Sequence, residues 1–369
     1  MTGTYPPMDV AGRAPHLREL FDEAGCDALV VSRLVNTRYL TGFTGSAGVL
    51  VVTPDELVLV TDGRYRDQAA EQFAAAGVEG RIDVGQTAAE QQELLAAAAS
   101  GHPRLGLEAA HVSWSTQRRY ASEWFPEVEL VATVGLVEGL RQFKDEGELS
   151  RMAAAAALAD AALAAVRHRL GEGPTEASFA LELDSEVRRL GADGASFETI
   201  VASGPNGAKP HARPGPRRII EGDLVVIDFG ATVEGYHSDM TRTTIVGRPT
   251  STQRRMLEVV VDSQAAGVRA VRSNVECVEV DRTCRGVIEE AGWLDAFLHG
   301  TGHGVGLEIH EDPRVAKTST AILGVHHVVT VEPGVYLPEH GGVRIEDTVV
   351  VTATGSRLLT HAPKDPYLT

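Results

Sequence analysis

The sequence predicts an α/β protein, with α+β character in its second part, built from two domains. Three observations lead to this prediction. A chain of 369 residues is too long for one ordinary hydrophobic core. Helix-like and strand-like segments alternate over about the first 135 residues, as in a compact α/β domain. Near residue 140 the pattern changes to an Ala-rich helical stretch, and after Gly194 it becomes strand-rich and Gly-rich. We therefore expect domains at 1–140 and 141–369.

The elements of the first domain follow from local patterns. The segment "LRELFDEAGCDALVVS" from Leu17 predicts an amphipathic helix that ends near Gly25, followed by an apolar strand. The segment "GVLVVTPDELVLVTDGRY" predicts two strands joined by a turn at Pro54 and Asp55. Helix-like "YRDQAAEQFAAAG" and strand-like "RLGLE" and "VELVA" continue the alternation.

The second domain is predicted to begin with two helices. The first is the Ala-rich stretch from about Glu146 to Leu170. The second has Thr175 at its N-cap. A full capping box is not expected there, because Ser178 takes the place of the usual Glu or Gln.

Composition narrows the class of protein. Apolar residues make up 43% and charged residues 23%, which is typical of a soluble globular protein. The net charge of −17 disfavours nucleic acid or an anionic membrane as a partner. No membrane span or signal peptide is expected, because the sequence lacks a run of about eighteen apolar residues and "MTGTYPPMDVAGRAPHL" has no apolar core. Cys26, Cys277 and Cys284 are interpreted as small buried hydrophobes in a reducing compartment. We therefore expect a cytoplasmic protein.

Three histidines lie in the segment "HGTGHGVGLEIHED", at His299, His303 and His310. The glycines among them disfavour a helix and indicate an extended or looped backbone that needs small residues at close quarters. Imidazoles on such a loop usually serve a functional site. The residues alone leave open which histidine coordinates a ligand.

Four acids follow a repeated pattern. Asp228 ends the apolar strand in "LVVIDFG", and Glu332 ends the one in "HVVTVEPG". A second acid follows each of them, Asp239 after Asp228 and Glu346 after Glu332. The pattern predicts two strand pairs, each with two acids, as halves of a pseudo-symmetric site.

Each acid also has a simpler interpretation. Asp228 and Glu332 could belong to solvated turns. Asp239 could pair with Arg242 and Glu346 with Arg344, the arginine two residues before it. However, an acid at the end of an apolar strand is costly to bury without a partner. One explanation that covers all four acids and the histidines is a metal centre.

Charge indicates the number of ions. Four carboxylates carry about −4, so two divalent cations would balance them if His303 is neutral, whereas one ion would leave uncompensated charge in a desolvated cleft. Carboxylate ligands with one imidazole suit Mn²⁺, and Zn²⁺ or Co²⁺ would also fit. Two bridged ions lower the pKa of a bound water and stabilise an oxyanion, which predicts metal-assisted hydrolysis.

The segments "VVIDFGATVEGYHSDMTRT", "HGTGHGVGLEIHE", "VEPGVY" and "GGVRIED" resemble, in this order, those of the pita-bread metallopeptidases. That family includes methionine aminopeptidase, aminopeptidase P and prolidase. The segments "NTRYLTGFTGSAG" and "VTDGRY" resemble the N-terminal domain of the proline-specific and creatinase-like branch, which methionine aminopeptidases generally lack. The resemblance implies a creatinase-like N-terminal domain at 1–140, which covers the cleft or forms a homodimer or higher oligomer. A pseudo-two-fold pita-bread catalytic domain follows at 141–369.

The resemblance also implies a ligand set of five residues. Asp239 and Glu346 would bridge the two ions, Asp228 would favour one ion, and His303 and Glu332 would bind the other. All five are present in the sequence. Their presence argues against creatinase, which does not use the metal, and against relatives that have lost ligands.

Other residues are implied on the substrate side. The position of His310 contacts the scissile peptide and shuttles protons in the proline-specific branch, and His211 in "KPHARPG" matches another substrate-side histidine. His211 could instead be an exposed structural histidine, and His299 could bind substrate or support the site by packing. Arg344 could orient Glu346, meet substrate or form a plain salt bridge.

The function implied by the resemblance is hydrolysis of the Xaa-Pro bond at the N-terminus of short proline-containing peptides. Glu332 would act as general base, and His310 would help the metals to stabilise the oxyanion. An Xaa-Pro aminopeptidase is favoured over a dipeptidase, because the compact length and "LTGFTGSAG" resemble small bacterial aminopeptidases. More distant alternatives are a creatinase-like amidinohydrolase and a non-enzymatic binding module.

A dipeptidase would need a cation for the free carboxylate of its product proline. No sequence rule chooses among the candidates, which are Arg33, Arg38, Arg64 and Arg344.

Overall fold

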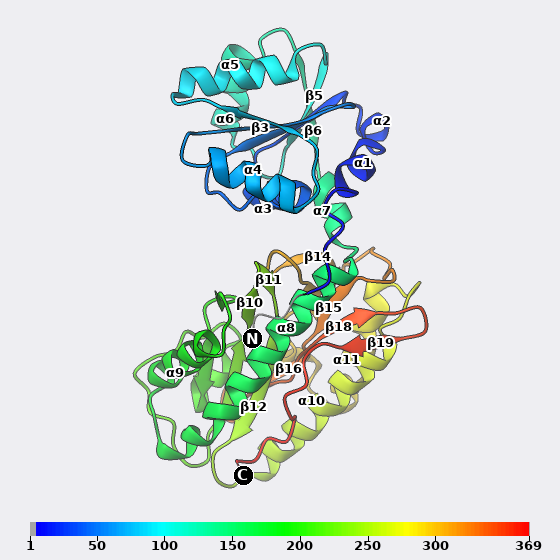
Figure 1. Ribbon diagram of the computed structural model, residues 1–369. Helices are drawn as coiled ribbons and strands as arrows, with labels where there is room; N and C mark the ends of the chain where they lie inside the picture. Colours follow the sequence, from blue (N-terminus) through cyan, green and yellow to red (C-terminus); the bar gives the residue numbers. More distant parts are fainter. Residues whose placement is uncertain (1–4, 369) are drawn as a thin grey trace. The chain divides into compact units, whose positions relative to one another are not determined.

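The structure is a computed structural model that describes residues 5–368 and divides into two compact units (Figure 1). One unit spans Pro7–Arg141. The other, here called the catalytic unit, runs from Gln142 onward and includes the N-terminal Tyr5 and Pro6.

The first unit is built on a six-stranded mixed sheet with the order β4-β3-β2-β1-β5-β6. Its strands are β1 (Ala28–Val31), β2 (Val49–Val52), β3 (Leu57–Thr61), β4 (Arg81–Val84), β5 (Arg104–Glu108) and β6 (Glu129–Thr133). Its helices are α1 (Arg13–Arg18), α2 (Phe21–Ala24), α3 (Leu34–Thr41), α4 (Arg66–Ala75), α5 (Ala88–Ala99), α6 (Trp114–Arg119), which continues into a π-helical turn (Tyr120–Trp124), and α7 (Leu136–Arg141).

Local predictions for this unit are confirmed with one change. The strands β2 and β3 pair antiparallel on either side of the Pro54–Asp55 turn. The helix predicted from Leu17 is instead interrupted after Arg18, so that α1 and α2 replace it. Gly25 ends α2 in the left-handed conformation, with φ 70°.

The catalytic unit begins with α8 (Glu146–Val166), which continues as a 3₁₀ turn (Arg167–Glu172). Fully buried alanines on α8, among them Ala155, Ala159 and Ala162, let the helix pack closely against its neighbours. Within the described chain, one segment, Glu146–Glu172, is long and apolar enough to cross a membrane by length and composition only. Half of its most apolar window is buried inside the protein, and a single helix of this kind is weak evidence for a membrane span.

Helix α9 (Glu176–Arg189) begins at the predicted N-cap, Thr175. The expectation that a full capping box is missing is wrong. The Thr175 hydroxyl accepts from the Ser178 N–H, and the Ser178 hydroxyl accepts from the Thr175 N–H, each at 3.1 Å. A serine hydroxyl therefore takes the role that Glu or Gln usually has in this box.

The strands of the catalytic unit form several small sheets. Two sheets of three strands have the orders β11-β10-β7 and β12-β9-β8, a sheet of five strands has the order β14-β13-β15-β18-β19, and β16 pairs with β17. These strands are β7 (Gly194–Ala195), β8 (Ile200–Ser203), β9 (Leu224–Phe229), β10 (Ala231–Val233), β11 (Tyr236–His237), β12 (Met240–Ile245), β13 (Gly302–Gly304), β14 (Glu311–Val315), β15 (Val328–Val331), β16 (Gly334–Leu337), β17 (Gly341–Arg344), β18 (Asp347–Val351) and β19 (Ser356–Leu358).

The remaining helices are α10 (Ser251–Ala270) and α11 (Cys277–Glu290), with 3₁₀ turns at Gly204–Ala208 and Leu294–Ala296. The helices divide into two pairs, each with its own core (Figure 1). One core joins α8 and α9 to β9 and β12, and the other joins α10 and α11 to β15 and β18. The unit therefore consists of two similar halves, each a helix pair packed on an antiparallel strand pair.

Candidate metal centre

The four predicted acids lie at matching places in the two halves. In the antiparallel pair β9–β12, Asp228 lies opposite Thr241, and Asp239 immediately precedes β12. In the pair β15–β18, Glu332 follows β15 and Glu346 precedes β18. All four acids line one cavity of about 570 Å³. The two-fold pattern read from the sequence thus brings the acids together.

His303 reaches this cavity from β13, between Gly302 and Gly304. A Cβ atom on Gly302 would lie 2.0 Å from the carbonyl oxygen of Thr330, and one on Gly304 would lie 2.3 Å from that of Asp312. The neighbouring strands therefore approach His303 more closely than any side chain would allow. The prediction of an extended backbone that needs small residues is confirmed.

The buried imidazole of His303 is oriented as a ligand. Its Nδ1 lies 2.9 Å from the carbonyl oxygen of Gly304, and since a carbonyl only accepts, Nδ1 is the protonated nitrogen. Its Nε2 lies 3.5 Å from Asp239 Oδ2 and 3.6 Å from Glu332 Oε1. Burial lowers the pKa of His303 to about 3, so the ring is neutral and its Nε2 lone pair faces the acids.

The acids lack enough positive charge around them. Loss of solvent around Glu332 raises its pKa to about 8, and burial together with the neighbouring carboxylates raises the pKa values of Asp239 and Glu346 well above their usual range. Of the described residues that line the cavity, Arg344 is the cation that is buried. The site therefore favours either protons or additional cations.

Two further observations fit metal ions. Asp228 Oδ2 accepts from Arg344 Nη2 at 2.5 Å, but the buried Oδ1 has no hydrogen-bond partner in residues 5–368. Such an oxygen is costly to leave unpaired. Asp239, His303 and Glu346 each offer an atom within 4.8 Å of the others. A donor set of carboxylate oxygens and one imidazole nitrogen fits Mn²⁺ or a similar divalent ion.

The predicted substrate-side histidines differ in their surroundings. His310 and His211 are exposed and line the same cavity. The His310 ring lies edge-on to the His303 ring, with centroids 4.4 Å apart. His299 also lines the cavity, but its Nε2 lies 2.8 Å from the Tyr336 hydroxyl, which accepts from Arg344 Nη1 at 2.8 Å. Burial lowers the pKa of His299 to about 4, so it is a neutral partner of Tyr336.

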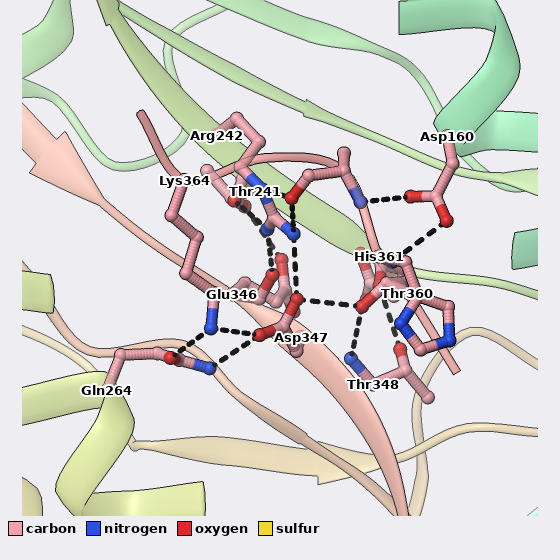
Figure 2. A network of polar contacts seen from close by, with 12 residues as sticks. Asp160, Thr241, Arg242, Gln264, Glu346, Asp347, Thr348, Thr360, His361 and Lys364 are labelled. Carbon is pink, nitrogen blue, oxygen red and sulfur yellow. Dashed lines mark hydrogen bonds and ion pairs between the residues drawn. The ribbon is translucent and has the colours of Figure 1, made fainter. Parts of the chain in front are cut away.

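Two of the simpler ion-pair interpretations are wrong. Arg344 pairs with Asp228 rather than with Glu346; it is the last residue of β17, and Glu346 lies beyond the end of that strand. Arg242 pairs with Asp347 rather than with Asp239, at 2.8 Å (Figure 2). The odd spacing between Asp239 and Arg242 points their side chains to opposite faces of the strand.

One charged cavity residue was missed by the sequence reasoning. Arg314 lines the cavity and is exposed, and none of the ion pairs of the described chain involves it. The burial of β14 alternates along the strand, so Arg314 faces the same side as Asp312. Continuing this alternation back to His310 would have pointed to Arg314 from the sequence.

The other candidates for a carboxylate-binding cation are placed differently. Arg33, Arg38 and Arg64 belong to the Pro7–Arg141 unit. Arg64 there pairs with Asp62 at 2.8 Å. Arg344 lies in the cavity, but its guanidinium contacts Asp228 and Tyr336.

Comparisons with known proteins agree with these features. Residues 150–353 match metallopeptidase family M24, and residues 13–143 match the creatinase/prolidase N-terminal domain. The peptidase YqhT of Bacillus subtilis is 41% identical over 353 residues, which are 95% of this chain and 98% of that protein.

Solved structures of two kinds of peptidase are similar to this chain. The Xaa-Pro dipeptidase from Bacillus anthracis has a TM-score of 0.93 at 36% identity, covering 97% of this chain and 99% of that one. The X-Pro aminopeptidase from Thermotoga maritima has a TM-score of 0.86 at 31% identity, covering 95% and 98%. The predicted fold, a pita-bread catalytic domain with a creatinase-like N-terminal domain, is confirmed.

Proposed function

Because the chain belongs to metallopeptidase family M24, we propose that it is a two-metal exopeptidase that hydrolyses Xaa-Pro bonds, with Xaa-Pro dipeptides as preferred substrates. The observation that supports this most directly is the convergence of four carboxylates and a neutral imidazole on one cavity. Mn²⁺ is the proposed ion, since the donor set is rich in hard oxygen ligands.

The proposed ligands are Asp228, Asp239, His303, Glu332 and Glu346. Two divalent ions held there would lower the pKa of a bound water and stabilise negative charge on the scissile carbonyl oxygen. Glu332 accepts the proton of the attacking water at its carboxylate, since a general base must lie beside the nucleophile. The proton then passes to the proline nitrogen as the C–N bond of the scissile peptide breaks. His303 stays neutral and would offer its Nε2 lone pair to one of the ions.

Substrate contacts come from the exposed side of the cavity. His310 donates a proton toward the carbonyl oxygen of the residue before proline, and His211 faces the same space. A tertiary Xaa-Pro amide has no N–H, so recognition depends on the carbonyl and on the shape of the pyrrolidine ring. Phe197, Ile200 and Pro210 provide apolar surface for that ring.

Arg314 favours a dipeptidase over an aminopeptidase. A dipeptide places a free carboxylate on the proline, and a cation without an ion pair of its own in this cavity would bind it. In a longer peptide that carboxylate is replaced by a neutral amide. The aminopeptidase remains the second candidate, because a structure with that name is similar over nearly the whole chain.

The test begins with protein stripped by a chelator and reloaded with Mn²⁺, assayed on Ala-Pro and on Ala-Pro-Ala. We expect metal-dependent cleavage with a preference for Ala-Pro. Replacing Arg314 by Ala should lower kcat/KM for Ala-Pro roughly 10- to 100-fold, since a charge-assisted hydrogen bond contributes about 1.5–3 kcal/mol. The tripeptide should be little affected. Lys317→Ala, which removes a nearby exposed cation outside the cavity lining, is the control.

Preference for the tripeptide would instead identify an aminopeptidase. Absence of cleavage of both peptides by the Mn²⁺-loaded protein would contradict the proposed function.

A further inference from the structure

A network of buried charges lies next to Glu346, one of the two acids proposed to bridge the ions (Figure 2). Arg242 on β12 and Asp347 on β18 form its centre, with relative exposures of 3% and 0%. Neither side chain belongs to the lining of the cavity that Asp239 and Glu346 line. Neither residue has a part in the chemistry proposed above.

All five N–H groups of Arg242 are used. Its Nη1 donates to the carbonyl oxygens of Thr241, at 2.9 Å, and Glu346, at 2.5 Å. Its Nη2 donates to Asp347 Oδ1 and to the carbonyl oxygen of Ala362, both at 2.8 Å, and its Nε donates to the same carbonyl at 2.9 Å. The guanidinium thus holds the backbone of Glu346 from behind.

Each oxygen of the Asp347 carboxylate likewise accepts from two donors. Its Oδ1 accepts from Arg242 and from the Thr360 hydroxyl, the latter at 2.9 Å. Its Oδ2 accepts from Gln264 Nε2 at 3.0 Å and from Lys364 Nζ at 2.6 Å. A fully paired buried network of this kind fixes one local arrangement.

The two strands are also joined around the acids themselves. The Thr241 hydroxyl donates to Glu346 Oε2 at 2.7 Å, and the Glu346 N–H donates to the carbonyl of Thr241 at 3.1 Å. In return, the Thr348 hydroxyl donates to the carbonyl oxygen of Asp239 at 2.7 Å. Each bridging acid is therefore tied to the strand that holds the other.

We propose that Arg242, Asp347 and Lys364 are positioning residues of the metal centre, so that the segment 360–364 is a functional part of it. The proposal rests on the proposed function for the identity of the bridging ligands, Asp239 and Glu346. According to this proposal, the affinity of the site for the two ions depends on a charged cluster that touches neither the ions nor the substrate.

Lys364 is the residue of this network whose replacement disturbs the rest of the protein least. Its side chain is 30% exposed, and its Nζ also donates to Gln264 Oε1 at 2.8 Å. Its loss would leave Asp347 Oδ2 and Gln264 Oε1 each short of one donor. Asp347 would then shift to regain a partner, and Glu346 is its direct neighbour in the chain. Replacement of this partly exposed side chain leaves the hydrophobic cores untouched.

The experiment measures Mn²⁺ binding to the metal-free full-length protein by calorimetric titration, and the electron paramagnetic resonance spectrum of bound Mn²⁺. Replacing Asp347 by Asn should weaken binding on the order of 10- to 100-fold, and Lys364→Met about tenfold, as found for residues that support metal ligands. The spectrum should lose the coupling of two adjacent ions. Lys364→Arg, which keeps the charge, should restore both.

Arg167→Ala is the matched control. Arg167 donates to the carbonyl oxygens of Asp365 and Tyr367, just after the segment 360–364, and to the Thr244 hydroxyl on β12, without touching Asp347. It should leave Mn²⁺ binding unchanged. Wild-type binding by both Asp347→Asn and Lys364→Met would overturn the proposal, as would an equal loss in Arg167→Ala. If Asp347→Asn fails to fold, the comparison of Mn²⁺ binding by Lys364→Met and Lys364→Arg is sufficient to test the proposal.

Variants of the bridging ligands show whether the ligand assignment itself is wrong. Glu346→Gln and Asp239→Asn should abolish binding of the ion pair. If both retain it, the proposed metal centre is wrong, and the network proposal falls with it. If both lose it while the network variants bind normally, the network proposal alone is wrong.

Discussion

Glu332 combines a proposed ligand role with an unusual affinity for protons. Loss of solvent, opposed by the charge of Arg344 and assisted by that of Asp228, raises its pKa to about 8 in the metal-free protein. Its backbone N–H donates to the carbonyl of Thr301 at 2.8 Å, which fixes its position beside β13. A carboxylate held this way is suited to accept a proton close to neutral pH.

Replacement of Glu332 by Gln tests this role at the scale of one residue. The amide has the same shape but cannot accept the proton, so kcat should fall by at least about 10²- to 10⁴-fold while the fold is retained. Steady-state kinetics on Ala-Pro and circular dichroism would measure the two effects. Glu339→Gln, an exposed acid on the following hairpin, should behave like wild type. Retained turnover in Glu332→Gln would refute the assigned role.

At the scale of elements, strand periodicity explains what the sequence could and could not predict. Apolar runs that end in acids identified β9 and β15, and their pairing with β12 and β18 brings Asp228 and Glu332 beside the second acids. The glycines around His303 predicted close backbone contact, which is found on β13. The pairing of Arg242 with Asp347 depends on which strands become neighbours. That choice is made by tertiary packing, so local pattern could not supply it.

The glycines flanking His303 give a prediction for β13. A methyl group at Gly302 would overlap the Thr330 carbonyl, so Gly302→Ala must push β13 away from β15. We expect a loss of stability of about 1–3 kcal/mol and a marked loss of Mn²⁺ affinity, because His303 would move with the strand. Gly286→Ala in α11 meets no atom within 4 Å and should instead stabilise the protein by about 0.5–1 kcal/mol. Calorimetry and Mn²⁺ titration compare the pair, and normal Mn²⁺ binding by Gly302→Ala would contradict the expectation.

At the scale of the whole molecule, the acidic centre makes stability depend on metal and on pH. In the metal-free protein the pKa of Glu332 is about 8, against 4.5 for the unfolded chain. The folded state therefore binds more protons than the unfolded state within this window, and rising pH favours unfolding. His299 and His327, whose pKa values burial lowers to about 4, and His303, whose pKa it lowers to about 3, have the opposite effect only below their unfolded value of 6.5.

Between pH 6.5 and 8 the effect of the acids should thus prevail. We expect the unfolding free energy of the metal-free protein to fall by roughly 1–2 kcal/mol over this interval for each carboxyl that is protonated in the folded state but ionised in the unfolded chain. With Mn²⁺ bound the decline should disappear, because cations replace the protons. Scanning calorimetry at several pH values, with EDTA or with Mn²⁺, would measure this pH dependence. The unfolding transition to follow is the one whose midpoint Mn²⁺ raises. Metal-free stability that stays level or rises over this interval would be inconsistent with the clustered charge.

The division of the acids between two halves also affects how the enzyme is made. A ribosome produces β9 and β12, with Asp228 and Asp239, well before it produces the strands that bring Glu332 and Glu346. During that interval the growing polypeptide contains Asp228 and Asp239 but not yet Glu332 and Glu346. Peptide-bond hydrolysis therefore cannot begin on a partly synthesised chain.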